Sequence, residues 1–174
     1  TYAGGPQRSL ERSTAAQITV EVDGEDSSEV WGSFRAARRA HPRGLFVGEK
    51  GGELIVQCSH DGYCRLGGEV IHTRKWQMSA DALTVTDQLA GKYESAVNRI
   101  HLHPDVEVFG SVSDGPSLLT VGLRGGHACL ALSGEILLVQ TGYHPLFGVT
   151  EPRVCVRSEF RGQCDGRWEW HTGA

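Results

Sequence analysis

Glycine-containing turn signals interrupt the chain at short intervals, and this spacing limits the folds that it can adopt. Between them lie segments rich in Val, Thr and Leu, residues typical of β-strands, and the 174 residues include 23 glycines. About a dozen strands at such spacing predict an all-β fold, a sandwich of two packed antiparallel sheets. The turn signals are Asp23-Gly24, Gly51-Gly52, Asp61-Gly62, Gly67-Gly68, Asp114-Gly115, Gly125-Gly126, Ser133-Gly134 and Asp165-Gly166.

Period-two alternation is clearest at residues 70–78, where Val70, Trp76 and Met78 share one face and Thr73 and Lys75 the other. No amphipathic helix is predicted. No repeat or linker divides the chain, which indicates a single domain over residues 1–174. Further strands are expected at residues 18–22, 32–39, 45–49, 53–59, 83–88, 96–103, 106–111, 118–123, 127–133, 135–141 and 153–160.

Composition excludes several classes of protein. No apolar run approaches the roughly 20 residues that span a bilayer, so no membrane span is expected. The net charge of -4 is spread over the whole chain, which argues against nucleic acid as a partner. The chain does not begin with Met and shows no signal peptide, so we expect a processed product or part of a longer protein.

The five cysteines form no Cys-x-x-Cys pair of the kind that binds zinc or acts as a redox dithiol. Cys58 and Cys64 flank one predicted turn, and Cys155 and Cys164 flank another, but neither pair is directly opposite in register. Disulfides there are possible without being required. Free, mostly buried thiols are the favoured interpretation.

His101, His103 and Glu107 give the sharpest metal-like pattern, because residues two apart on a strand project from the same face. Their spacing resembles the first half of the cupin metal motif, so a cupin-like metal enzyme is one alternative. The flanking glycines and a third histidine do not fit that motif, and Pro104 interrupts the strand. Two histidines on a polar sheet face is the competing interpretation.

A second constellation is polar and suits carboxylated sugars. His72 and Arg74 share one predicted strand face, and arginine binds carboxylates with two parallel hydrogen bonds. Trp31 and Phe34 can stack on a sugar ring, although such aromatic residues more often fill a core. Signatures of serine hydrolases, phosphate-binding loops and zinc helices are absent from the sequence.

Residues 11–43, "ERSTAAQITVEVDGEDSSEVWGSFRAARRAHPR", resemble the C-terminal β-domain of heparinase II/III-like polysaccharide lyases. Relatives there carry Arg-Ser-Thr-x-Ala-His-Asn-Thr-Val before an Asp-Gly turn, then Ser-Glu-x-Trp-Gly and an arginine-rich strand. The resemblance continues through "HDGYCRLGGEVIHTRKW", "LTVTDQLAG", "IHLHPDVEV" and "GYHPLFG", which together extend over nearly the whole chain.

The resemblance implies one part of a two-part enzyme that cleaves uronic-acid polysaccharides, such as heparan sulfate or alginate, by β-elimination. An N-terminal α/α toroid supplies most catalytic residues in that family, and the β-sandwich closes the cleft. The toroid is missing here, so this chain alone is expected to be inactive. A non-catalytic carbohydrate-binding or interface module is a further alternative. The substrate-binding candidates are Arg12, Trp31, Arg35, His72, Arg74 and Tyr143.

Gln17 departs from the family pattern, because it stands where relatives carry histidine. Glutamine is a poor zinc ligand and cannot act as an acid or base near neutral pH. We therefore expect no confident catalytic residue and no cofactor in this chain, with zinc possible in the full-length parent. The expected partners are an anionic polysaccharide and the missing toroid domain. The substrate class implies a periplasmic or secreted location.

Overall fold

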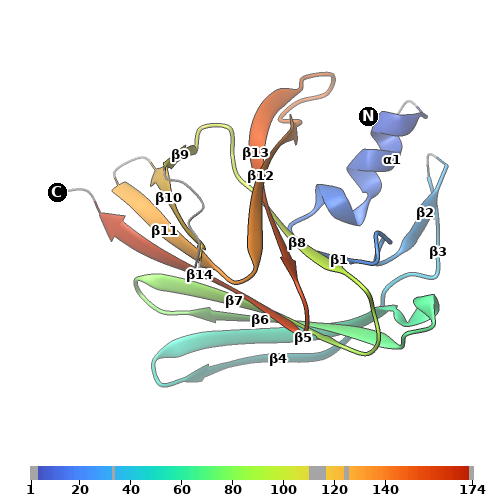
Figure 1. The fold of residues 1–174 in the computed structure, drawn as a ribbon, viewed down its shortest axis with the longest axis horizontal. Coiled ribbons are helices and arrows are strands. Elements are labelled where there is room, and N and C mark those ends of the chain that lie inside the picture. Colours follow the sequence, from blue (N-terminus) through green and yellow to red (C-terminus); the bar gives the residue numbers. More distant parts are fainter. Residues whose placement is uncertain (1–3, 33, 110–116, 124–125, 173–174) are drawn as a thin grey trace.

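The computed structural model describes residues 4–32, 34–109, 117–123 and 126–172, and it forms the predicted antiparallel β-sandwich (Figure 1). One sheet has four strands in the order β1-β8-β13-β12, and the other has eight in the order β4-β5-β6-β7-β14-β11-β10-β9. Strands β2 and β3 form a separate hairpin.

The helices are α1 (Pro6–Arg12) and the 3-10 turns η1 (Thr14–Ala16) and η2 (Cys64–Leu66). The strands are β1 (Val20–Val22), β2 (Glu29–Trp31), β3 (Arg35–Ala37), β4 (Pro42–Lys50), β5 (Glu53–Tyr63), β6 (Val70–Met78), β7 (Ala82–Ala90), β8 (Ala96–His101), β9 (Glu107–Phe109), β10 (Ser117–Leu123), β11 (Gly126–Leu132), β12 (Glu135–Tyr143), β13 (Glu151–Phe160) and β14 (Gln163–Thr172).

The small sheet lies between α1 and the curved large sheet (Figure 1). Across the described residues, no helix is long and apolar enough to cross a membrane. All five cysteines are free, as expected, but only two of the five are buried, Cys155 and Cys164, and the other three are partly buried.

Two dipeptides predicted as turns lie inside strands instead. Gly62 belongs to β5, where a Cβ would lie 2.2 Å from the carbonyl oxygen of Ser27. Gly166 belongs to β14, where a Cβ would lie 3.0 Å from a methyl group of Leu132. These glycines permit close packing rather than chain reversal. The turn predicted at Asp114-Gly115 falls outside the described residues.

Other element predictions also need correction. The helix α1 was not predicted, because its seven residues, none of them buried, are too few for an apolar stripe. Strand β14 was not predicted either, since Gly166 was assigned to a turn. The strand expected at residues 96–103 ends at His101, and the one expected at residues 32–39 is reduced to β3.

The core between the sheets consists of two apolar clusters. The first contains Val20, Val22, Tyr63, Val70, Leu89, Ala96, Phe160 and Cys164. Tyr63 is fully buried in it, and its hydroxyl donates to the carbonyl oxygen of Val20 at 2.5 Å. The second contains Leu102, Leu119, Val121, Ala128, Leu130, Leu132, Ile136 and Val156.

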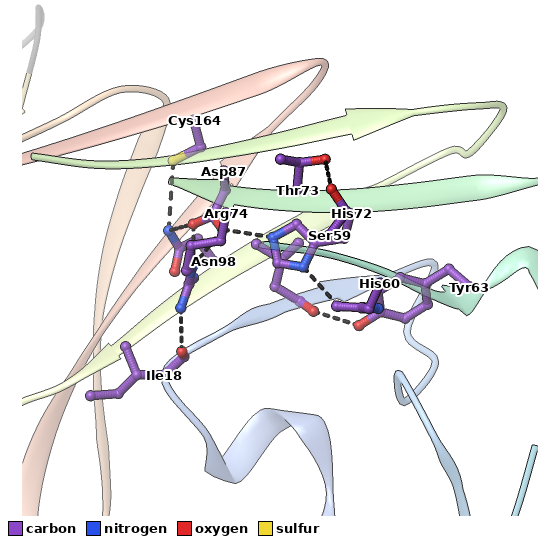
Figure 2. Close-up of polar contacts among 11 residues, drawn as sticks. Ile18, Ser59, His60, Tyr63, His72, Thr73, Arg74, Asp87, Asn98 and Cys164 are labelled. Atoms are coloured by element: carbon purple, nitrogen blue, oxygen red, sulfur yellow. Dashed lines mark hydrogen bonds and ion pairs between the residues drawn. The ribbon is translucent and has the colours of Figure 1, made fainter. Parts of the chain in front are cut away.

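A fully buried carboxylate, Asp87 of β7, is the centre of a polar network in this interior (Figure 2). Its oxygens accept hydrogen bonds from Nε and Nη2 of Arg74 at 2.7 and 2.8 Å and from Nδ2 of Asn98 at 3.0 Å. Nε2 of His72 lies 2.6 Å from Oδ1. Burial alone raises the pKa of Asp87, but the hydrogen bonds from His72 and Arg74 outweigh it and hold that pKa below the ordinary value.

The network reaches both sheets and the chain that enters β1. Arg74 and His72 lie on β6, whereas Asn98 lies on β8 of the small sheet. Nη1 of Arg74 also donates to the carbonyl oxygen of Ile18 at 2.5 Å (Figure 2). One buried charge therefore holds together three parts of the fold that are far apart in the sequence.

A second histidine extends this network. Nε2 of His60 lies 2.9 Å from Nδ1 of His72, and the two residues are directly opposite in the β5–β6 pair. Burial lowers the pKa of His60 from 6.5 to about 4, with the neighbouring His72 acting in the same direction. His60 is therefore neutral in the folded protein near pH 7.

Replacing the central carboxylate tests how much the fold depends on it. Asp87→Asn keeps the shape but leaves the guanidinium of Arg74 without its counter-charge, so we expect a loss of about 3–5 kcal/mol in the free energy of unfolding. Urea denaturation measures this loss. The matched control is Asp105→Asn, at a carboxylate that is 73% exposed, and it should change the stability by less than about 0.5 kcal/mol. Equal stability of Asp87→Asn and the wild type would contradict this role.

The stability should also depend on pH in a defined direction. Between pH 6.5 and about 4 the unfolded chain protonates His60 while the folded protein keeps it neutral, so stability falls as the pH drops through this interval. Protonation of Asp87 removes further stability at still lower pH. Thermal melts of the wild type and His60→Gln at pH 7 and pH 5 measure the effect. The variant should lose less stability on acidification than the wild type. An identical loss in both proteins would show that His60 does not cause the pH dependence.

Candidate functional site

A cavity of about 520 Å³ lies between α1, η1 and the strands of the small sheet, and we call it the α1 cavity. Its size is that of ordinary small-ligand sites. The sheet side is formed by His101 of β8, Thr141 of β12 and Arg153 of β13. Thr141 and Arg153 are directly opposite each other in the β12–β13 pair, and β13 in turn pairs with β8. Three neighbouring strands thus place hydroxyl, guanidinium and imidazole groups around one space.

Polar atoms of all three side chains lack protein partners. Nδ1 of His101, Oγ1 of Thr141 and Nε of Arg153 are buried and form no hydrogen bond within the part of the chain that the structure describes. Buried polar groups in proteins nearly always have a partner. Three unpaired atoms around one cavity therefore point to a polar ligand.

The hydrogen-bonding state of His101 follows from its other nitrogen. Nε2 lies 3.0 Å from the carbonyl oxygen of Ala15, which can only accept, so Nε2 carries the proton. Burial lowers the pKa of His101, and the nearby charge of Arg153 adds to this effect. The ring is neutral near pH 7, and its unpaired Nδ1 is a hydrogen-bond acceptor.

The helix side of the α1 cavity is also polar. Nε2 of His144 lies 3.2 Å from Nε2 of Gln7 and 3.9 Å from the carboxylate of Glu11, and Oγ1 of Thr150 lies 3.1 Å from Nδ1 of the same ring. Gln7 and Glu11 are one helical turn apart on α1 and are themselves hydrogen bonded. This arrangement holds α1 over the sheet.

A second cavity, of about 380 Å³, opens between the two sheets, with Trp76, Trp168 and Trp170 in its walls. Its polar lining includes Arg74 and Asn98, whose donors are directed to Asp87. The substrate-binding candidates His72 and Arg74 thus have their polar groups engaged inside the protein, and His72 is only 2% exposed. His101 lines this cavity as well, and Oδ1 of Asn98 is buried there without a partner. Its guanidinium, Arg74, is already paired with Asp87, whereas Nε of Arg153 in the α1 cavity is unpaired, so we favour the α1 cavity.

Three other candidates, Arg12, Trp31 and Arg35, come together at the β2–β3 hairpin. Arg12 donates to the carbonyl oxygens of Gly32 and Arg35 at 3.1 and 3.2 Å, which fixes the hairpin against α1. Trp31 is 46% exposed, and Arg35 is exposed as well. The hairpin therefore presents an aromatic ring and positive charge to solvent.

The last substrate-binding candidate, Tyr143, lies beside the α1 cavity. The guanidinium carbon of Arg153 is 6.0 Å from the centre of its ring. His103 packs edge-on against the same ring, with 5.0 Å between the ring centroids. Tyr143 thus supports the arginine from outside the cavity lining.

The metal candidates His101, His103 and Glu107 are not brought together as one group. His101 bonds to the carbonyl oxygen of Ala15, His103 follows the end of β8, and Glu107 begins β9 in the other sheet. Within the described ranges, the residues that can jointly hold a metal ion lie elsewhere.

Gln17 likewise offers no zinc site in this chain. It is exposed and lines a shallow depression with Arg12, Ser13 and Thr14. No histidine, cysteine or carboxylate is among the described residues that line it. The donors around Gln17 therefore do not fit a zinc ion.

Sequence reasoning missed the residues that matter most. Asp87 carried a usable signal, since it shares a strand face with Leu83, Val85 and Leu89 and is thus a carboxylate on an apolar face. Thr141 and Arg153 carried none, because only the pairing of β12 with β13 brings them together.

Comparisons with known proteins place the chain in a family. A family model described as heparinase II/III-like, C-terminal, matches residues 1–163. A solved structure titled as a heparinase III gene product aligns with 99% of this chain at a TM-score of 0.71 and 13% identity, which is a likeness of fold. The chain spans 27% of the length of that protein. No curated protein matches the sequence. The match over residues 1–163 shows that the chain belongs to the heparinase II/III-like C-terminal family.

Proposed function

We propose that this chain is the β-sandwich part of a polysaccharide lyase that cleaves uronic-acid-containing polysaccharide by β-elimination. The family match over residues 1–163 carries the proposal. The chain spans 27% of the heparinase III that shares its fold, which supports a further N-terminal domain as its partner. Acting on such a polymer is consistent with a periplasmic or secreted location.

The α1 cavity is where a uronate unit contacts this domain. Arg153 binds the carboxylate, because a guanidinium forms strong, charge-assisted hydrogen bonds with it. Nδ1 of His101 accepts a hydrogen bond from a sugar hydroxyl, and the hydroxyl of Thr141 completes the set. The ligand thereby satisfies three atoms that have no partner within the described chain.

These contacts have a defined role in β-elimination. The reaction removes the proton at C5, next to the carboxylate, and expels the oxygen at C4, so negative charge grows on the carboxylate as the proton leaves. A fixed guanidinium stabilises that charge. The base and the acid that complete the reaction come from the toroid, as the family resemblance implies. Within this chain, the contribution is binding and charge stabilisation.

The isolated chain should therefore be inactive as a lyase. Incubated with heparan sulfate or alginate, it should produce no rise in the ultraviolet absorbance of the conjugated double bond that elimination creates. A characterised lyase acting on each polymer serves as the positive control. A rise in absorbance with the purified chain alone would show that the catalytic groups lie within it.

Binding of a uronate oligosaccharide tests the cavity itself. Arg153→Gln should weaken binding by roughly 10- to 100-fold, the range expected for losing a charged hydrogen bond. Isothermal titration calorimetry of the purified chain with a uronate trisaccharide measures the change. The matched control is Arg157→Gln, on the same face of β13 but outside the cavity, and it should bind like the wild type.

A variant in the β2–β3 hairpin tests whether the hairpin or the α1 cavity is the contact surface. Arg35→Glu should leave trisaccharide affinity unchanged if the α1 cavity is the site. If Arg35→Glu abolishes binding while Arg153→Gln does not, the hairpin is the contact surface and the cavity assignment is wrong.

A further inference from the structure

Three side chains with atoms that can ligate a metal ion lie together on the outer face of the large sheet, on strands β11 and β14. His127 and Cys129 are two residues apart on β11, so they project from the same face. His171 of β14 is directly opposite His127 in the register of the pair. The ligand atoms of the three residues all lie within 4.8 Å of one another.

These side chains are not part of the core or of either cavity described above. Their neighbours Ala128 and Leu130 point into the second apolar cluster, which leaves the alternate residues on the outside. His127 and His171 are exposed and Cys129 is partly buried. The two imidazole rings stack with centroids 5.0 Å apart and an angle of 21° between their planes.

The donor set determines which ion fits. Two imidazoles and a thiolate suit a borderline-soft cation, and three protein ligands with solvent in the fourth position is a common zinc arrangement. Glu169 lies opposite Cys129, but its carboxylate accepts a hydrogen bond from Arg167 at 2.8 Å. The three side chains therefore leave a fourth position open to solvent.

The geometry needs only a small adjustment. Zinc bonds of about 2.3 Å to sulfur and about 2.1 Å to nitrogen place tetrahedral ligand atoms roughly 3.5 Å apart. Rotation of exposed side chains closes the remaining gap of about 1 Å without moving the strands. Oγ1 of Thr120 lies 4.0 Å from Sγ of Cys129 and helps to orient the sulfur.

We infer that His127, Cys129 and His171 bind a zinc ion on the outer face of the large sheet. The site is independent of the proposed lyase role, because no residue of the α1 cavity takes part. Binding couples β11 to β14 and releases a proton from the thiol as the thiolate coordinates.

Metal titration of the complete, reduced chain tests the site. Zn²⁺ should bind with one equivalent in competition with a chromophoric chelator, and Co²⁺ should give the near-ultraviolet charge-transfer absorption of a thiolate ligand. Cys129→Ser should abolish that absorption. It should also weaken zinc binding by more than about tenfold. Mutating residues that only support the ligands usually lowers metal affinity by at least about tenfold, and losing a ligand should cost more.

Two controls and a second variant make the result decisive. Cys58→Ser and His103→Gln remove a partly buried thiol and an exposed imidazole outside the cluster, and both should bind zinc like the wild type. His171→Gln should weaken binding even if Cys129→Ser fails to fold. The absence of one-equivalent binding by the wild type would overturn the inference. So would cobalt absorption that lacks the thiolate band, or equal losses in Cys58→Ser and Cys129→Ser.

Discussion

A single buried negative charge organises this fold. Asp87 has no contact with solvent, and such a charge is tolerated only when fully paired and hydrogen bonded. Arg74 and His72 pair with it from the neighbouring strand, and Asn98 does so from the other sheet. Because the guanidinium and amide must both reach one carboxylate, the two sheets have little freedom to slide. The apolar clusters fill the space between the sheets, whereas the carboxylate fixes the position of one sheet relative to the other.

This constraint also places the candidate site. Asn98 donates to Asp87 and lies three residues before His101 on β8. The network therefore fixes the position of β8, and with it the position of the imidazole in the α1 cavity. Arg74 reaches the carbonyl oxygen of Ile18, just after the η1 turn that covers the same cavity. Both walls of the cavity are therefore tied to one buried group. The network therefore makes the cavity a rigid part of the fold.

Local patterns in the sequence predicted most of the strands but few of the residues around the α1 cavity. The bounds of β6 are those predicted, Val70 to Met78, because alternation is a property of the strand itself. Gly62 and Gly166 were assigned to turns, since a sequence does not distinguish a glycine needed for reversal from one needed for close packing. Thr141 and Arg153 lie twelve residues apart and meet only through strand pairing. Sites built across strands depend on register, which the sequence of one strand does not contain.

The most direct measurement is nuclear magnetic resonance of the labelled chain during titration with a uronate trisaccharide. The side-chain signals of His101 and Arg153 should shift in a saturable manner, with the backbone signal of Thr141, while Trp168 and Trp170 of the intersheet cavity remain unchanged. Shifts confined to the tryptophan indoles, or to Trp31 and Arg35 of the hairpin, would contradict the assignment of the α1 cavity as the uronate contact.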